Sequence, residues 1–361
     1  MTASLADLLV DDGGVADDLA EDRALVRESR TTGRARAVTV SLALTVAGFM
    51  AFCISISVGD FPIPLADVIP AVFGFGGQDS DFIVRQLRLP RALTAVLVGA
   101  AFGLSGAIFQ SLARNPLASP DIIGITAGAS ASAVFIIVVV GGSGLMVSVG
   151  ALVGALITAV AIYLLAYRRG VSSYRLVLVG IGISAMLAAV TSYLLTRAEI
   201  YDAQRATVWL TGSLNGRGWD QVRPVAASLI VLIPATLVLA RPLRLLQLGD
   251  DTAKGLGVAV EPARAALVLV GVALAAIATA AAGPIAFVAF VAAPIARRLV
   301  NAPLAIVPAA LAGAVLVLVS DIVARRVFAP TELPVGVVTG IIGAPYLVWL
   351  LARANRIGTA G

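Results

Sequence analysis

The stretch that decides the fold is ARAALVLVGVALAAIATAAAGPIAFVAFVAAPIARRLV, residues 263–300, which is apolar except for arginines near its two ends. A helix needs about 20 apolar residues to cross the hydrocarbon of a bilayer, so this run is long enough for two crossings. Gly283-Pro284 divides it, and proline interrupts a helix because it has no N–H to donate. The stretch therefore predicts two successive membrane helices, 263–281 and 284–300.

Runs of the same kind recur along the 361 residues. The chain is 59% hydrophobic and 13% charged, with a mean hydropathy of +0.99, whereas soluble domains carry about 25% charged residues. The runs are long and unbroken, unlike the short alternating segments of a membrane β-barrel. We therefore predict an all-α integral membrane protein of about ten transmembrane helices. The other eight predicted spans are 38–58, 90–112, 121–140, 145–167, 174–196, 222–240, 304–324 and 335–352.

The first 37 residues do not have the pattern of a signal peptide, which is basic first and then briefly apolar. Residues 1–28 hold eight Asp and Glu, and Arg30, Arg34 and Arg36 follow directly before the first apolar run. We expect 1–37 to be a largely disordered cytoplasmic tail, with a short amphipathic helix as the alternative. The transmembrane domain is then 38–355, and 356–361 is a cytoplasmic C-terminal end.

The distribution of positive charge predicts the orientation. Ten spans place both termini on one side, and with that side in the cytoplasm the inner segments hold 17 Lys and Arg against nine in the outer segments. This excess agrees with the positive-inside rule for a protein of the cytoplasmic membrane. Nine outer arginines is nevertheless a high number. The positive charge as a whole lies at the ends of apolar runs, which favours contact with lipid headgroups over nucleic-acid binding.

The sequence lacks the residues that several classes of protein function require. It has no histidine, one cysteine (Cys53) and one lysine (Lys254), which is not part of a phosphate-binding Gly-rich motif. We therefore expect no metal site, no directly bound cofactor and no catalytic activity in this chain. An ion-coupled secondary carrier needs ionisable groups near the bilayer centre, and the predicted spans have almost none. The energy for any transport should come from another subunit.

Three polar segments lie between the spans. LGDDTAKGLG, 248–257, reads either as an ordinary loop or as a short helix that a cytoplasmic partner pushes. RNPLASPD, 114–121, is a turn, since Pro116 and Pro120 prevent a continuous helix and Asn115 can bond freed backbone groups; it could also belong to an inner gate. The outer stretch 197–221 is amphipathic and has Trp209 and Trp219, which favour the membrane interface over a vestibule.

Seven stretches of the chain form an ordered set of motifs. They are LRLPRAL 87–93, GLSGAIFQ 103–110, NPLASPDIIG 115–124, the segment 248–257, GPIAFV 283–288, DIVAR 321–325 and ELPVGVVTG 332–340. Taken in this order, they resemble the FecCD family, the permease subunits of ABC importers for iron–siderophores, haem and cobalamin. The resemblance implies a cobalamin-importer-type bundle of ten spans.

The resemblance also implies partners and a substrate. These are a second permease subunit, expected to be a different but similar chain, two cytoplasmic ATPase subunits that hold ATP and Mg, and an outer substrate-binding protein. The expected cargo is an iron(III)–siderophore complex, because LTGSLNGRGW at 210–219 looks closer to the siderophore branch. Haem or cobalamin carried by the same machinery is the alternative.

Four groups of residues follow from the resemblance. Arginines at the outer rim are expected to dock the binding protein, with headgroup contact as the alternative; the fifth span and the helix after it are expected to line the pathway. The docking residues are Arg88, Arg91 and Arg325; the pathway residues are Ser184, Ser192, Tyr193 and Thr196; the gate or turn residues are Asn115, Pro116 and Pro120; and the ATPase-coupling residues are Gly249, Asp250, Asp251, Lys254, Gly255 and Gly257.

Overall fold

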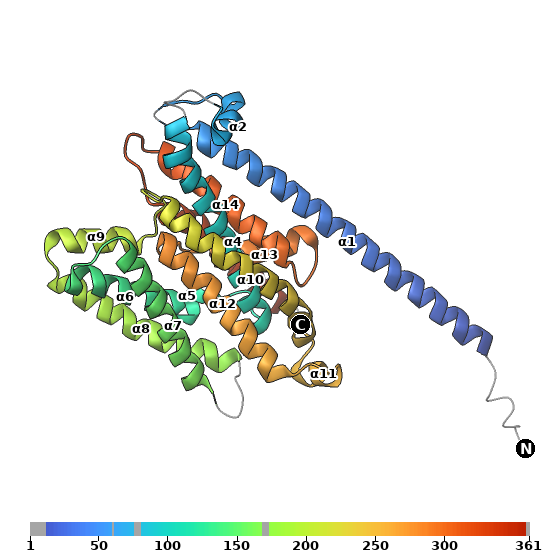
Figure 1. Ribbon diagram of the computed structural model, residues 1–361. Helices are drawn as coiled ribbons and strands as arrows, with labels where there is room; N and C mark the ends of the chain where they lie inside the picture. Colours follow the sequence, from blue (N-terminus) through green and yellow to red (C-terminus); the bar gives the residue numbers. More distant parts are fainter. Residues whose placement is uncertain (1–11, 60, 76–80, 168–172, 359–361) are drawn as a thin grey trace, which may run out of the picture.

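The structure is a computed structural model that describes residues 12–59, 61–75, 81–167 and 173–358. Its elements are helices packed as a bundle (Figure 1). They are α1 (Asp12–Ser57), α2 (Leu65–Phe73), the π-helix η2 (Ile83–Arg88), α4 (Leu89–Ala113), α5 (Pro120–Ile123), α6 (Ile125–Phe135), the π-helix η3 (Ile136–Val140), α7 (Leu145–Ala166), α8 (Ser173–Arg197), α9 (Ile200–Leu210), α10 (Trp219–Leu246), α11 (Asp250–Gly255), α12 (Val260–Ala282), α13 (Val288–Val300), α14 (Ile306–Arg326) and α15 (Val335–Gly358).

The predicted all-α membrane fold is confirmed, and each of the ten predicted spans contains a helix. Among the described residues, seven helical stretches are long and apolar enough to cross a membrane. The stretches Ile125–Val140 and Val335–Leu350 are shorter apolar helices, and α13 has 13 residues. The break at Gly283-Pro284 lies where it was predicted, between α12 and α13. The predicted span 121–140 is divided by Gly124 into α5 and the longer helix that follows it.

The expectation of a largely disordered tail is wrong for residues 12–37. The helix α1 begins at Asp12 and continues without interruption for 46 residues into the first span (Figure 1). Starting a helix is the costly step, whereas extending one that the membrane span already stabilises costs little. The N-terminal part of α1 therefore projects past the bundle. Residues 1–11 and 359–361 lie outside the described residues.

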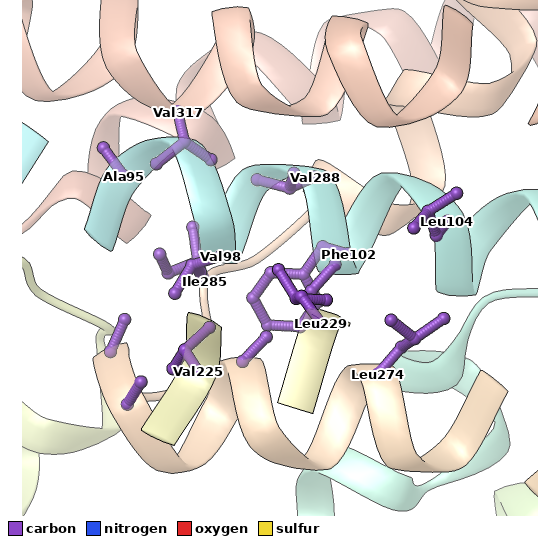
Figure 2. Close-up of a cluster of buried hydrophobic side chains, with 14 of the residues drawn as sticks. Ala95, Val98, Phe102, Leu104, Val225, Leu229, Leu274, Ile285, Val288 and Val317 are labelled. Carbon is purple, nitrogen blue, oxygen red and sulfur yellow. The ribbon is translucent and has the colours of Figure 1, made fainter. Parts of the chain in front are cut away.

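The helix α4 forms the centre of the bundle, with 78% of its most apolar window buried. It packs against α10, α12, α13 and α14. Figure 2 shows Phe102 of α4 close to Leu229 of α10, within one continuous apolar cluster. Gly99 of α4 and Gly313 of α14 face each other, and a Cβ on either would collide with the other's carbonyl oxygen. Small residues at such a contact allow membrane helices to approach backbone to backbone.

Two long helices are peripheral. Only 6% of the most apolar window of α1 and 11% of that of α8 is buried within the chain. The two helices lie on opposite sides of the bundle (Figure 1). Their exposed apolar faces must therefore contact lipid or another subunit.

The contact between α4 and α14 can be tested by adding one methyl group. Gly99→Ala should lower the free energy of unfolding by about 1–3 kcal/mol, because the new Cβ overlaps the Gly313 carbonyl. Gly33→Ala on α1 is the matched control, since nothing lies within 4 Å of its added Cβ. Thermal unfolding in detergent measures both variants. Equal unfolding temperatures would show that α4 and α14 are not in close contact.

Candidate functional site

The short helix α11 lies at the same end of the bundle as the N-terminal part of α1 (Figure 1). Gly249 precedes it at φ +115° and Gly257 follows it at φ +83°, backbone conformations that favour glycine. Ala253 is fully buried and anchors the helix on the bundle. The segment 248–257 therefore contains a short helix and is not an ordinary loop, while its role as a lever stays a prediction.

One face of α11 is fixed to the bundle through Asp250. Its Oδ2 accepts a hydrogen bond from Arg264 Nη2 of α12 at 2.8 Å, and its Oδ1 accepts one from Arg114 Nη2 at 3.3 Å. Arg264 is buried and also pairs with Glu261 at 3.2 Å. The expectation that Asp250 touches the ATPase stays a prediction, and within the chain its carboxylate bonds two arginines.

The other face of α11 points away from the bundle. Asp251 is fully exposed and pairs with Lys254 at 3.6 Å. Leu248 and Leu256, at either end of the helix, are both more than half exposed. Apolar side chains beside charges on a surface outside the candidate spans are typical of a protein-binding surface. Asp251 and Lys254 thus lie where a partner can reach them, and Gly255 ends the helix.

The segment 114–124 begins beside α11. Arg114 ends α4, and its Nη2 donates to Leu246 O at 2.6 Å as well as to Asp250. Asn115 Oδ1 accepts a hydrogen bond from Leu117 N at 2.9 Å, so the predicted turn is present. Ser119 Oγ caps α5 by accepting from Ile122 N at 3.4 Å, with Pro120 at the first helical position. Pro116 lines a small hollow with Arg297 and Arg298.

The far end of this segment rests directly on α8. A Cβ at Gly180 of α8 would collide with the Ile123 carbonyl oxygen of α5, so the two backbones are in contact. Ser184 Oγ donates to Gly180 O at 2.8 Å and lies against Gly124. The segment 114–124 therefore connects α11, through Arg114, to α8, through Ile123, by contiguous contacts.

The predicted pathway residues divide into two groups. Ser192, Tyr193 and Thr196 are exposed on the half of α8 that is far from α5. The Arg197 guanidinium lies 5.7 Å from the centroid of the Tyr193 ring. Ser184 is half-buried and packs against the end of α5 at Gly124, so it does not lie on an open surface.

The three predicted docking arginines lie together at the opposite end of the bundle, around a buried carboxylate. Asp321 of α14 has a side chain only 1% exposed, and it pairs with Arg91 at 3.0 Å and with Arg325 at 3.2 Å. Arg91 also pairs with Glu332 at 2.9 Å. A buried carboxylate is stable only when cations and donors compensate it, so Asp321 holds α4 to α14 at this end.

Two of these arginines also bond the end of α1. Arg325 Nη1 donates to Ser55 O and Val58 O, both at 3.2 Å, and Arg88 Nη1 donates to Ile56 O at 2.8 Å and Ser57 O at 3.1 Å. A helix leaves its last four carbonyls without internal partners, and cations there also compensate the helix dipole. The docking role of Arg88, Arg91 and Arg325 stays a prediction, and the structure gives all three a role in holding helices together.

A hollow of 650 Å³ lies beside this cluster. Its lining includes Trp209, Arg205, Arg217, Asn215 and Glu332. Burial lowers the pKa of Arg217, whose Nε donates to Ser213 O at 3.3 Å. The amphipathic stretch 197–221 thus contributes polar and apolar side chains to the hollow. Its second tryptophan, Trp219, donates its Nε1 hydrogen to Arg85 O at 3.0 Å.

Sequence reasoning missed the partners of these charges. It identified Arg91 and Arg325 but not their buried partner Asp321. It identified Asp250 but not Arg114 and Arg264, which bond its carboxylate. The spacing of Asp321 and Arg325, four residues apart on one helix, was the available signal. Among the described residues, no group of three or more His, Cys, Asp or Glu side chains is placed to hold a metal ion.

Comparison with known proteins gives the family. Residues 37–353 match the model of the FecCD transport family. The chain belongs to this family. It is 44% identical to the ferric enterobactin transport system permease protein FepG of Escherichia coli over 299 residues, which are 82% of this chain and 91% of FepG.

Two further relatives and one solved structure are also similar to this chain. The chain is 42% identical to the achromobactin transport system permease protein CbrC of Dickeya dadantii, over 90% of this chain and 93% of CbrC. It is 40% identical to the iron(3+)-hydroxamate import system permease protein FhuG of Bacillus subtilis, over 84% of this chain and 94% of FhuG. Its fold is similar to an inward-facing metal-chelate type ABC transporter, with a TM-score of 0.76 and 27% identity over 87% of this chain and 99% of that one.

The buried carboxylate generates a stability prediction for this FecCD protein. Asp321→Asn should lower the free energy of unfolding by about 3–5 kcal/mol, because Arg91 and Arg325 lose their shared counter-charge. Asp251→Asn, at a fully exposed carboxylate, is the control and should leave stability unchanged. Thermal unfolding in detergent measures both. An Asp321→Asn protein as stable as the control would mean that the cluster does not hold this end together.

Proposed function

We propose that this chain is the permease subunit of an ATP-driven importer that moves an iron(III)–siderophore complex across the cytoplasmic membrane by alternating access. The substrate class is supported by the printed names of the relatives, which are permeases for ferric enterobactin, achromobactin and iron(3+)-hydroxamate. The observation that carries the mechanism is the contact chain from α11 through Arg114 and α5 to α8.

In this proposal ATP and Mg bind to two separate cytoplasmic ATPase subunits, and the free face of α11 rests on one of them. Closure of the ATPase pair pushes α11. Because Asp250 bonds Arg114, the push reaches the segment 114–124 and then Gly180 of α8. ATP acts by favouring one of two packings of the permease pair over the other.

The remaining partners are assigned by exposure and charge. The exposed face of α8 suits a second permease subunit, a different but similar chain, with the pathway between the two and Ser192, Tyr193 and Thr196 on its wall. The substrate-binding protein docks at the opposite end from α11, over the arginine cluster and the hollow beside it. Both termini then lie in the cytoplasm, in agreement with the excess of inner positive charge.

The substrate is tested by uptake in cells with and without this gene. Radio-iron is supplied on several siderophores, with labelled cobalamin measured in parallel. Loss of uptake of an iron–siderophore, with cobalamin uptake intact, is the expected result. Loss of cobalamin uptake with iron uptake intact would overturn the proposed cargo.

The mechanical link is tested in the assembled transporter. Arg114→Gln should reduce transport about tenfold while ATP hydrolysis continues, since α11 loses its bond to the segment that contacts α8. Arg241→Gln on exposed α10 is the matched control and should transport normally. Normal transport by the Arg114→Gln protein would exclude this route of coupling.

A further inference from the structure

A groove of 710 Å³ runs along α1 on the side of the bundle away from α8. Its walls come from α1, α10 and the start of α14, and its lining is mainly apolar, including Val38, Leu42, Leu237, Val307 and Leu311. The α1 helix leans away from the bundle toward its N-terminus (Figure 1), which opens the groove at that end. In a bilayer, an open apolar groove between two spans is filled by acyl chains, because water would find no partners there.

Two arginines stand in the lining of this groove. Arg34 comes from α1 and Arg244 from the last turn of α10, and both side chains are exposed. Among the described residues neither guanidinium has a hydrogen bond or ion pair. Arg36, two residues along α1, differs because its Nε donates to Leu299 O at 2.9 Å and so is committed within the chain.

The positions of Arg34 and Arg244 indicate which class of ligand the groove would bind. Arg244 lies two residues before the end of α10, and α11 follows directly, so both arginines are at the end of the bundle that the proposed function places in the cytoplasm. The inner leaflet carries anionic lipids, and basic pockets between membrane helices on this side bind their headgroups. Two guanidiniums beside an apolar groove match a phosphate with an attached acyl chain.

We propose that this groove is a specific site for one anionic phospholipid of the inner leaflet. Its phosphate lies between Arg34 and Arg244, and an acyl chain lies against Val38, Leu42 and Leu237. The lipid fills the space between α1 and α10 in the half of the bundle where α1 leans away. The arginine cluster around Asp321 holds α1 at the other end without it.

The test titrates the full-length chain in mild detergent with phosphatidylglycerol or phosphatidylcholine, and native mass spectrometry counts the bound lipids. One phosphatidylglycerol should bind more tightly than phosphatidylcholine, and added salt should weaken it. Arg244→Gln should weaken phosphatidylglycerol about fivefold, as expected for one arginine at a headgroup. Arg241→Gln is the control, because Arg241 is exposed on the same helix but does not line the groove.

A second pair of variants tests the apolar part of the site. Val307→Trp should fill the groove and abolish the tight phosphatidylglycerol site, whereas Val319→Trp, also exposed on α14 but outside the groove, should retain it. Equal binding of the two lipids, or equal effects of the two arginine variants, would overturn the proposal in favour of ordinary annular lipid. A second copy of the chain bound in place of lipid, and lost in Val307→Trp, would also overturn it.

Discussion

The close packing of α4 against α14 and α13 is the constraint on which the rest of the structure depends. Without a hydrophobic driving force between helices in lipid, association depends on close backbone approach, which the glycines facing each other at 99 and 313 provide. Both candidate sites are attached to this helix. One end carries Arg91 of the Asp321 cluster, and the other ends at Arg114, which bonds Asp250 of α11. The central helix thus joins the two candidate sites.

The parts around this frame have fewer contacts within the chain. The exposed helix α8 touches α5 through its backbone at Gly180, and α5 is joined to α11 through a single turn and the Arg114 guanidinium. A rigid centre with a short mechanical connection to a peripheral helix is the arrangement that an externally driven switch requires, because packed elements shift between discrete positions. A carrier driven by an ion gradient would instead need its ionisable groups near the substrate site.

Hydropathy predicted the ten helices and their order because each span must satisfy its backbone hydrogen bonds internally in lipid. It did not predict the helix over 12–37, whose polar composition resembles a disordered tail until the adjoining span nucleates it. The family resemblance identified Asp250 and Arg325 as functional, which stays a prediction, but it did not give their partners within the chain. The pairing of Asp250 with Arg264 joins two different helices, and a pairing set by helix packing leaves little trace in one sequence. The pairing of Arg325 with Asp321 lies within one helix and left its i,i+4 spacing as a signal.

The central claim is that α11 moves α8 through Arg114, and a distance measurement tests it most directly. Spin labels replace Tyr193 on α8 and Val319 on α14 in a Cys53→Ser background, within the assembled transporter. The account predicts that ATP changes the distance between the labels, and that Arg114→Gln abolishes this change while ATP is still hydrolysed. The same ATP-dependent change in the Arg114→Gln protein would contradict it.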